Sequence, residues 1–304
     1  MTGAGGATRQ GGEAHEDLEA LEAAVSRALE RGDASALQIL GYGEISAVVA
    51  WPIGGRQMAC KRLPPFADTE ALEAYRGCVE VYLERLEASG LRPVETEVLA
   101  VRGGDGRPVA YCVQPVLPPG SVLHEHLRGC DDEAALALFD RVLDHVARCL
   151  DGTLGIDAQV SNWVATAGGL LYLDVSTPMI RDERGRETLD TGLFLASLPW
   201  ALRGLVRRFM LGAILDKYYS PRGAVVDLLG NLLKERLDRL FPVFLARANR
   251  SVSPKITEAE VRAYYRGDAR MWALLQSLRR TDRAWQRRVR RRVYPFLLPG
   301  RISR

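Results

Sequence analysis

Gly155-Ile-Asp-Ala-Gln-Val-Ser-Asn-Trp-Val164 and Leu171-Tyr-Leu-Asp-Val175 are the most informative segments of the sequence. Asp157 stands five residues before Asn162, and Asp174 stands twelve residues after it. A loop aspartate, an asparagine at the start of a strand and an aspartate ending the next strand have the spacing of a phosphoryl-transfer site. In such sites one acid orients a hydroxyl nucleophile, while the amide and the second acid hold Mg²⁺. The spacing predicts a catalytic Asp157 and the metal ligands Asn162 and Asp174.

A strand-rich block upstream contains a glycine-rich bend and a strand lysine. Gly41, Gly43 and Ser46 form an incomplete GxGxxG pattern, in which glycine would let the backbone approach a phosphate. Lys61 follows in a strand beside small apolar residues, 20 positions after Gly41. Two interpretations stay open for each feature: phosphate ligands, or ordinary turn glycines and a solvated edge lysine.

Residues 68–89 form a predicted helix, because apolar side chains recur in it at helical spacing. Its acids lie largely on the solvated face. Glu80 adjoins the apolar stripe and is the first candidate for an ion pair with Lys61, and Glu84 is the second. The alternative is that neither acid has a special role.

The order of elements predicts an α+β fold with two lobes. Five strands with one main helix after the third are followed by Leu117-Pro-Pro-Gly120, a candidate boundary. The chain then becomes mostly helical, with segments expected at about 192–215, 222–249, 257–267 and 268–293. We therefore divide the chain into a disordered segment plus helix (1–34), a nucleotide-binding lobe (35–117) and a helical lobe (118–304).

Composition places the chain among ordinary globular proteins, with 47% hydrophobic and 26% charged residues. Five scattered cysteines without a CxxC pair argue against disulfides or a zinc site and favour a reducing, cytoplasmic setting. No signal peptide is recognisable, and arginines interrupt the most apolar stretch, so we expect no transmembrane segment. The Ala-, Arg-, Leu- and Gly-rich composition suggests a bacterium of high GC content.

Charge is unevenly distributed along the chain. Residues 1–150 carry 14 basic and 23 acidic side chains, whereas the remainder carries 27 basic and 15 acidic ones. The basic part contains the predicted chemistry, so an anionic substrate or partner is favoured there over a polycation.

The ordered set of motifs resembles the protein-kinase-like superfamily, and within it the aminoglycoside- and choline-phosphotransferase branch more than the eukaryotic protein kinases. The resemblance covers residues 36–180. It implies a five-stranded nucleotide-binding lobe and a mostly helical lobe, with ATP and Mg²⁺ as cofactors. It also implies residue roles, which are carried over position by position. Those roles are the glycine-rich loop (Gly41, Gly43, Ser46), the phosphate-binding lysine and its partner (Lys61, Glu80), the adenine-binding hinge (Gln114 to Leu117, including Val116), the catalytic aspartate (Asp157) and the metal ligands (Asn162, Asp174).

The chain departs from the family pattern at three places. Gly155 stands where the family usually has histidine, Asp174-Val-Ser176 replaces Asp-Phe-Gly, and no Ala-Pro-Glu activation segment is present. These departures favour a small-molecule or peptide phosphotransferase over a regulated protein kinase.

The resemblance implies transfer of the γ-phosphoryl group of ATP to a hydroxyl of a natural product, an anionic metabolite or a peptide serine or threonine. The basic second half makes a polycationic aminoglycoside a less favoured acceptor, although an antibiotic-resistance kinase stays an alternative. A pseudokinase that only binds nucleotide is a second alternative. The choice between ATP and GTP and the oligomeric state stay open.

A basic run near the C-terminus suggests a third function. Arg279 to Arg292 contains eight arginines and Trp285, a composition that can bind nucleic acid or anionic lipid. The simpler interpretation, which we favour, is a solvated helix face that pairs with the acidic first lobe.

Overall fold

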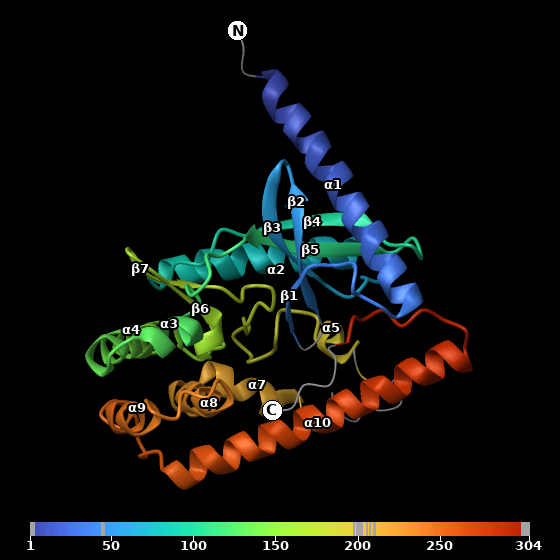
Figure 1. The fold of residues 1–304 in the computed structure, drawn as a ribbon. Coiled ribbons are helices and arrows are strands. Elements are labelled where there is room, and N and C mark those ends of the chain that lie inside the picture. The colour runs from blue at the N-terminus through green and yellow to red at the C-terminus, as the bar shows by residue number, and fades with distance from the viewer. Residues whose placement is uncertain are drawn as a thin grey trace.

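The computed structural model of the chain describes residues 4–43, 46–196 and 211–298, together with residues 198, 203, 204, 206 and 208. Figure 1 shows an α+β architecture, with a five-stranded antiparallel sheet in the first part of the chain and helices in the second. This confirms the predicted fold class and is compatible with a bilobal kinase-like fold. The helical segment expected at about 192–215 lies largely outside the described residues.

The sheet contains five antiparallel strands in the order β1-β2-β3-β5-β4. Their bounds are Ile39–Tyr42, Ala47–Ile53, Arg56–Arg62, Pro108–Pro115 and Glu97–Arg102 in that spatial order. Continuous ladders hold the inner strands, with Lys61 of β3 opposite Cys112 of β5. The pairing of β1 with β2 shifts register between Ile39 and Gly41. Both faces of β5 are buried along most of its length, because a helix covers each side of the sheet.

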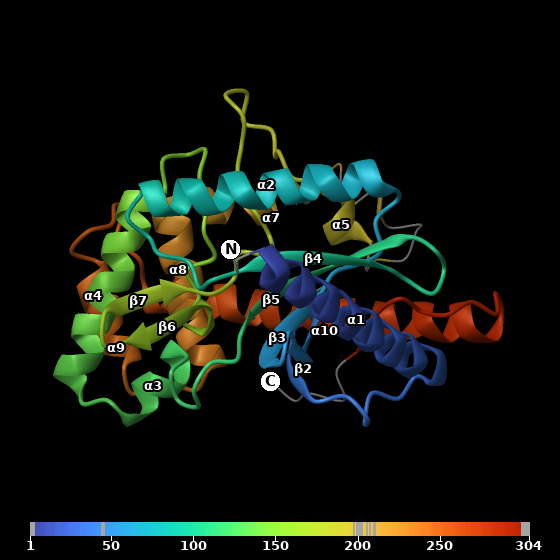
Figure 2. The same ribbon diagram turned by 90° about the horizontal axis from the view of Figure 1, so that it is seen from above.

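Helix α2, Thr69–Ala88, covers one face of the sheet and reaches into the second lobe. Asp68 caps its first turn by accepting a hydrogen bond from the Ala71 amide at 2.8 Å. Tyr75 and Val79 pack against the sheet, whereas Tyr82 belongs to the core of the helical lobe. The helix therefore contacts both halves of the molecule, as Figure 2 shows from above.

Helix α1, Ala4–Arg31, covers the other face of the sheet. This corrects the expectation that the first fifteen residues are disordered, because the helix begins at Ala4. Leu18, Leu21 and Val25 are buried against the strands. The buried Arg62 of β3 donates two hydrogen bonds to Glu22 of the helix, at 2.7 and 2.8 Å. The part of the helix from Leu18 to Leu29 therefore belongs to the core of the sheet.

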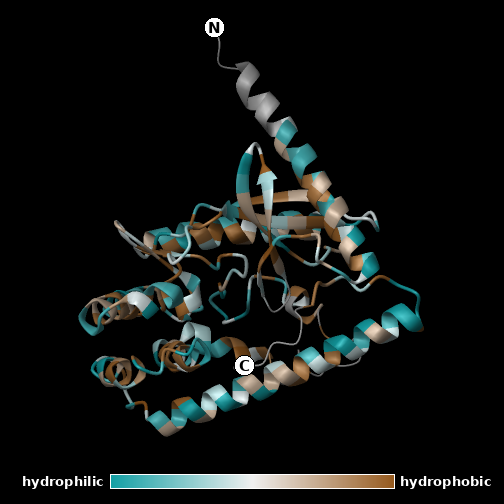
Figure 3. Cartoon of the chain, in the orientation of Figure 1, coloured by the Kyte–Doolittle hydropathy of each residue, from teal (hydrophilic) through white to brown (hydrophobic). Residues whose placement is uncertain are grey.

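The second lobe is mostly helical, with a small hairpin set against it. Its elements are α3 (Leu123–Gly129), α4 (Asp132–Cys149), η1 (Val160–Asn162), β6 (Trp163–Thr166), β7 (Gly169–Tyr172), α5 (Gly192–Leu195), α7 (Leu211–Asp216), η2 (Lys217–Tyr219), α8 (Pro221–Lys234), α9 (Phe241–Ala248) and α10 (Glu258–Arg288). Figure 3 shows apolar residues concentrated on α8 and α9, and their inward side chains form the largest core together with α4.

Two helix boundaries differ from the sequence-based prediction. The segment expected at 222–249 is two helices, because the chain turns at Arg236, whose φ is +57°, and the Leu237 amide bonds to the Leu232 carbonyl. Conversely, the segments expected at 257–267 and 268–293 are one helix, α10. The Gly267-Asp268 pair does not interrupt it, since the buried Val261 and Arg279 lie 18 residues apart on one face.

Candidate functional site

The β6–β7 hairpin brings Asn162 and Asp174 to the same end of the ladder. The Leu173 amide donates to the Asn162 carbonyl at 2.8 Å, extending the pairing beyond the two strands. Asn162 Nδ2 donates to the backbone carbonyl of Asp157 at 3.2 Å. This bond ties the loop carrying Asp157 to the hairpin and leaves the amide oxygen of Asn162 without a protein donor among the described residues.

Lys61 reaches from the sheet to the hairpin. Its Nζ lies 2.7 Å from Asp174 Oδ1, and both side chains are largely buried. Ser176 Oγ donates to the same carboxylate oxygen at 3.0 Å. Burial would raise the pKa of Asp174, but the charge of Lys61 and the hydrogen bonds from Lys61 and Ser176 outweigh it and hold that pKa below its ordinary value. Asp174 is therefore ionised at neutral pH.

Asp157 has the opposite electrostatic setting. Burial and the nearby charge of Asp227 raise the pKa of its carboxyl to about 7, although Lys217 acts in the other direction. Its backbone amide donates to Tyr172 OH at 3.0 Å, which fixes the loop to β7. Two carboxyl groups of one site thus differ widely in proton affinity, a pattern common where one acid accepts a proton and the other stays charged.

A buried polar network from helix α8 supports the loop that carries Asp157. Asp227 accepts hydrogen bonds from Lys217 at 2.9 Å, from Tyr264 of α10 and from Gln159 Nε2 at 3.1 Å. Asn231 Nδ2 donates to Gln159 Oε1 at 3.0 Å. A pocket of about 230 Å³ adjoins this network between α8 and α10. None of these residues could be predicted from the sequence, because they lie far apart along the chain and form no recognisable motif.

The expected partner of Lys61 is corrected by the structure. Glu80 and its alternative Glu84 are both exposed on α2, on the face turned away from the sheet. Lys61 is paired with Asp174 instead. The helix places Tyr75 and Val79 against the sheet, so a glutamate at position 80 points about a quarter-turn or more away from the lysine.

Two tyrosines of α2 take over the contact between this helix and the site. Tyr75 OH donates to the Ser176 carbonyl at 2.9 Å, and Tyr82 OH donates to the Gly155 carbonyl at 3.0 Å. Helix α2 thus binds both the loop after Asp174 and the loop before Asp157. In the sequence, Tyr75 and Tyr82 are part of an apolar pattern at helical spacing, which predicts only that they are buried. Such a pattern does not show whether a buried tyrosine also donates a hydrogen bond to a loop.

Gly155 is explained by close packing. A Cβ atom at this position would lie 2.9 Å from the ring of Tyr219 and 3.1 Å from Met179 Cβ. The Gly155 amide and carbonyl are both hydrogen-bonded, to Met179 and to Tyr82 respectively. No side chain fits here, so the ring of Tyr219 occupies the space that a histidine at this position would need.

The glycine-rich bend and the hinge lie at two ends of the sheet. The Gly43 amide donates to the Ser46 carbonyl at 2.9 Å, and a Cβ at Gly43 would lie 2.7 Å from Ser46 Oγ and 3.9 Å from Lys61 Cε. The bend is therefore adjacent to Lys61. Ser46 Oγ is buried and has no hydrogen-bond partner within the described part of the chain. Gly41 lies in β1, opposite Val48, with open space where a side chain would be.

In the hinge, Gln114 Nε2 donates to the Leu173 carbonyl, the residue before Asp174, at 2.9 Å. This bond ties β5 directly to the hairpin. Val116 follows the strand and is exposed, and its backbone amide has no acceptor among the described residues.

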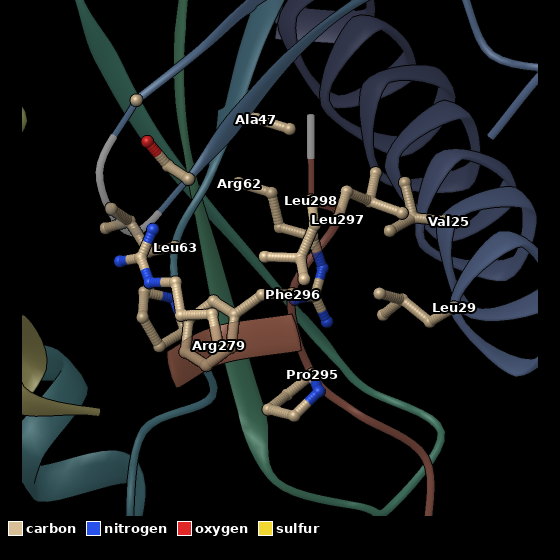
Figure 4. Close-up of a pocket in the computed structure, with 13 residues that line it drawn as sticks. Val25, Leu29, Ala47, Arg62, Leu63, Arg279, Pro295, Phe296, Leu297 and Leu298 are labelled. Atoms are coloured by element: carbon tan, nitrogen blue, oxygen red, sulfur yellow. The ribbon is translucent and has the colours of Figure 1, made fainter. Parts of the chain in front are cut away.

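A pocket lies where the C-terminal segment meets the sheet. Figure 4 shows Arg62, Val25 and Leu29 facing Phe296 and Leu297 across it. Gly43 and Ser46 line its edge, so the segment after α10 packs beside the glycine-rich bend.

The residues of the site suit a magnesium ion bound together with a polyphosphate. Asp174 uses one carboxylate oxygen for Lys61 and Ser176, and its other oxygen and the Asn162 amide oxygen accept no hydrogen bond from the described residues. Carboxylate and amide oxygens are the ligands that Mg²⁺ prefers. Among the described residues no group of three or more His, Cys, Asp or Glu side chains is arranged to hold a metal.

Within the described part of the chain, no helix is both long enough and apolar enough to cross a membrane. No curated protein matches the chain. A family model described as a family of unknown function, DUF6206, matches residues 20–283, a range that includes the sheet, the hairpin and most of α10. The chain belongs to this family.

Proposed function

We propose that this protein is an ATP- and Mg²⁺-dependent phosphotransferase that moves the γ-phosphoryl group to a hydroxyl acceptor. The observation that carries the proposal is the ion pair of Lys61 with Asp174 at 2.7 Å, which joins the third strand of the sheet to the end of the hairpin. This pair connects the two motifs that the sequence separates by more than a hundred residues. The Leu173 amide bonds to the Asn162 carbonyl, so Asn162 lies at the same end of the hairpin as this ion pair.

In the proposed reaction Lys61 neutralises phosphate charge, and Ser46 Oγ donates a hydrogen bond to a phosphate. Asn162 and Asp174 would hold Mg²⁺, and the ion would supply positive charge there. Asp157 accepts the proton of the attacking hydroxyl. A carboxyl with a pKa of about 7 suits this role, because it is partly ionised near neutral pH and still basic enough to take a proton.

The surroundings of Asp157 favour an acceptor that is not a polycation. Lys234 lies 3.3 Å from Gln159 Oε1, two positions from Asp157, and Lys217 contacts the Asp227 that neighbours it. These cations add to the basic composition of the helical lobe. We propose an anionic metabolite, a natural product or a peptide hydroxyl as the acceptor class.

The alternative is a protein that binds nucleotide without transferring phosphate. The exposed Glu80 favours this alternative, because Lys61 lacks the glutamate partner that the family resemblance implies.

Calorimetric titration with Mg²⁺ and a non-hydrolysable ATP analogue tests nucleotide binding. The proposal predicts Mg²⁺-dependent binding by the wild type, and at least tenfold weaker binding by Lys61→Met and by Asp174→Asn. Arg266→Gln, at an exposed position of α10, is the matched control for loss of one cation and should bind like the wild type. Absence of binding by the wild type, or equal binding by all four proteins, would overturn the proposal.

A further inference from the structure

The end of α10 and the turn after it form a surface that the proposed phosphotransferase activity does not use. We call residues 283–293 the basic tip. They include six arginines, and no aspartate or glutamate follows Asp282 in the chain. Local positive charge is therefore not balanced within the segment itself.

The basic tip also exposes apolar side chains. Trp285, Val289 and Val293 are 53%, 57% and 51% exposed. Single exposed apolar residues are common, but three within nine positions, one of them a tryptophan, form a local cluster. These three side chains therefore form a hydrophobic surface in contact with water, which a binding partner could cover.

The arginines of the basic tip are largely unused in the fold. Arg287 donates to the backbone carbonyls of Glu30 and Arg31, and so caps the end of α1. Arg288, Arg290, Arg291 and Arg292 are exposed and take part in no ion pair with a described residue. These four arginines are solvated, as the simpler interpretation of the sequence expected, but they do not pair with described acids of the first lobe.

The backbone presents these side chains outward. Val289 and Arg290 amides both bond to the Trp285 carbonyl, and the Arg292 amide bonds to the Gln286 carbonyl at 2.9 Å. These bonds fold the residues after the helix into a compact turn. Tyr294 is buried beyond it, so the chain returns to the body of the protein. Figures 1 and 2 both show this end of α10 projecting beyond the helices of the second lobe.

We propose that the basic tip binds the surface of a bilayer that contains anionic lipids. Four free arginines would attract the phosphate headgroups, while Trp285, Val289 and Val293 would enter the boundary between headgroups and acyl chains. Tryptophan and arginine together on one short segment are typical of interfacial binding. Nucleic acid fits less well, because exposed valines have no complementary group on a sugar-phosphate backbone. The inference is independent of the phosphotransferase proposal.

Cosedimentation with vesicles tests this inference. The full-length protein is mixed with vesicles of phosphatidylcholine alone or of equimolar phosphatidylcholine and phosphatidylglycerol. We expect binding only to the anionic vesicles. A quadruple variant, R288Q/R290Q/R291Q/R292Q, should bind them about 100-fold more weakly, since each arginine near such a surface adds severalfold to the partition.

The matched control removes the same charge elsewhere. Arg56, Arg184, Arg250 and Arg266 are exposed and make no side-chain contact that is recorded for the described residues, so R56Q/R184Q/R250Q/R266Q should bind like the wild type. Far-ultraviolet circular dichroism checks that both quadruple variants are folded. If both variants bind equally well, or if the wild type binds neutral vesicles equally well, the inference fails.

A second measurement separates lipid from nucleic acid and does not depend on the arginine variants. Tryptophan emission of the wild type should shift to shorter wavelength with anionic vesicles, and Trp285→Phe should abolish the shift, because Trp285 enters the interface. The proposal would be overturned in favour of nucleic acid if the wild type bound a duplex oligonucleotide but showed neither cosedimentation with anionic vesicles nor an emission shift.

Discussion

At the scale of single residues, Asp157 and Asp174 show how one chain gives two carboxyl groups different properties. Asp174 is buried beside Lys61 and stays ionised, whereas burial and the charge of Asp227 raise the pKa of Asp157 to about 7. The sequence spacing identified both residues. It could not assign their proton affinities, because Asp227 comes from a helix seventy residues further along the chain.

The raised pKa of Asp157 predicts a stability difference that depends on pH. Its ordinary pKa is 3.8, so the folded state holds a proton that the unfolded state has lost between roughly pH 4 and pH 7. The stabilisation from that proton is complete below pH 4 and is lost as the pH rises through 7. Asp157→Asn should therefore be more stable than the wild type at pH 8, by on the order of 1–4 kcal/mol. Urea unfolding at pH 8 and pH 5 should show a smaller difference at pH 5, and equal differences would contradict this account.

Gly155 predicts a second effect at this scale. Gly155→Ala places a methyl group 2.9 Å from the Tyr219 ring and should destabilise the fold by about 1–3 kcal/mol. Gly77→Ala is the matched control, because a Cβ there meets nothing within 4 Å inside α2. That change should stabilise the protein by about 0.5–1 kcal/mol. Thermal unfolding of the two variants checks the opposite signs.

At the scale of elements, α2 is the element whose role changed most between sequence and structure. Apolar periodicity predicted its bounds to within one residue at each end, because helical spacing of buried side chains is a strong local signal. It could not predict which side chain faces Lys61. A shift of one position along a helix rotates a side chain by about a quarter-turn, enough to move Glu80 from the sheet to solvent.

The contact of α2 with the site is tested by paired substitutions. Tyr82→Phe leaves the Gly155 carbonyl without its donor and should cost about 1–3 kcal/mol of unfolding free energy. If the proposed function holds, it should also lower phosphoryl transfer, since the loop bearing Asp157 loses an anchor. Glu80→Ala should change stability by less than about 0.5 kcal/mol, because the carboxylate is exposed. A large loss of activity or stability in Glu80→Ala would show that the lysine uses this glutamate after all.

At the scale of the whole molecule, the later part of α1 and the segment after α10 pack in one core with the sheet. Helix α1 packs on the strands, and Leu297 packs against the same core after α10 has crossed the second lobe. The sequence predicted the sheet, the hairpin and most helices, since these follow from periodicity and turn residues. It did not predict that the segment after α10 packs against α1 and the sheet, because contacts between residues about 260 positions apart leave no local pattern in the sequence.

The packing of the segment after α10 predicts that two leucine-to-alanine substitutions in the last part of the chain change stability unequally. Leu297→Ala should destabilise the protein by about 1–2 kcal/mol, because the side chain is partly buried against the core that α1 forms with the sheet. Leu274→Ala is the matched control, since Leu274 is 54% exposed on α10 and should have an effect near zero. Equal effects on the midpoint of urea unfolding would contradict the packing of the C-terminal segment.

The central claim is that Lys61, Asp157, Asn162 and Asp174 together carry out phosphoryl transfer. The most direct test follows γ-labelled ATP, with Mg²⁺ and a protein-free cell extract as the source of acceptors, and compares the wild type with Asp157→Asn. Loss of a positioned general base typically costs about 10²–10⁴-fold in rate. We predict that the wild type moves label from ATP to a compound in the extract and that Asp157→Asn is slower by about this factor while remaining folded. Equal transfer by both proteins, or no transfer by a wild type that binds the nucleotide, would contradict the account.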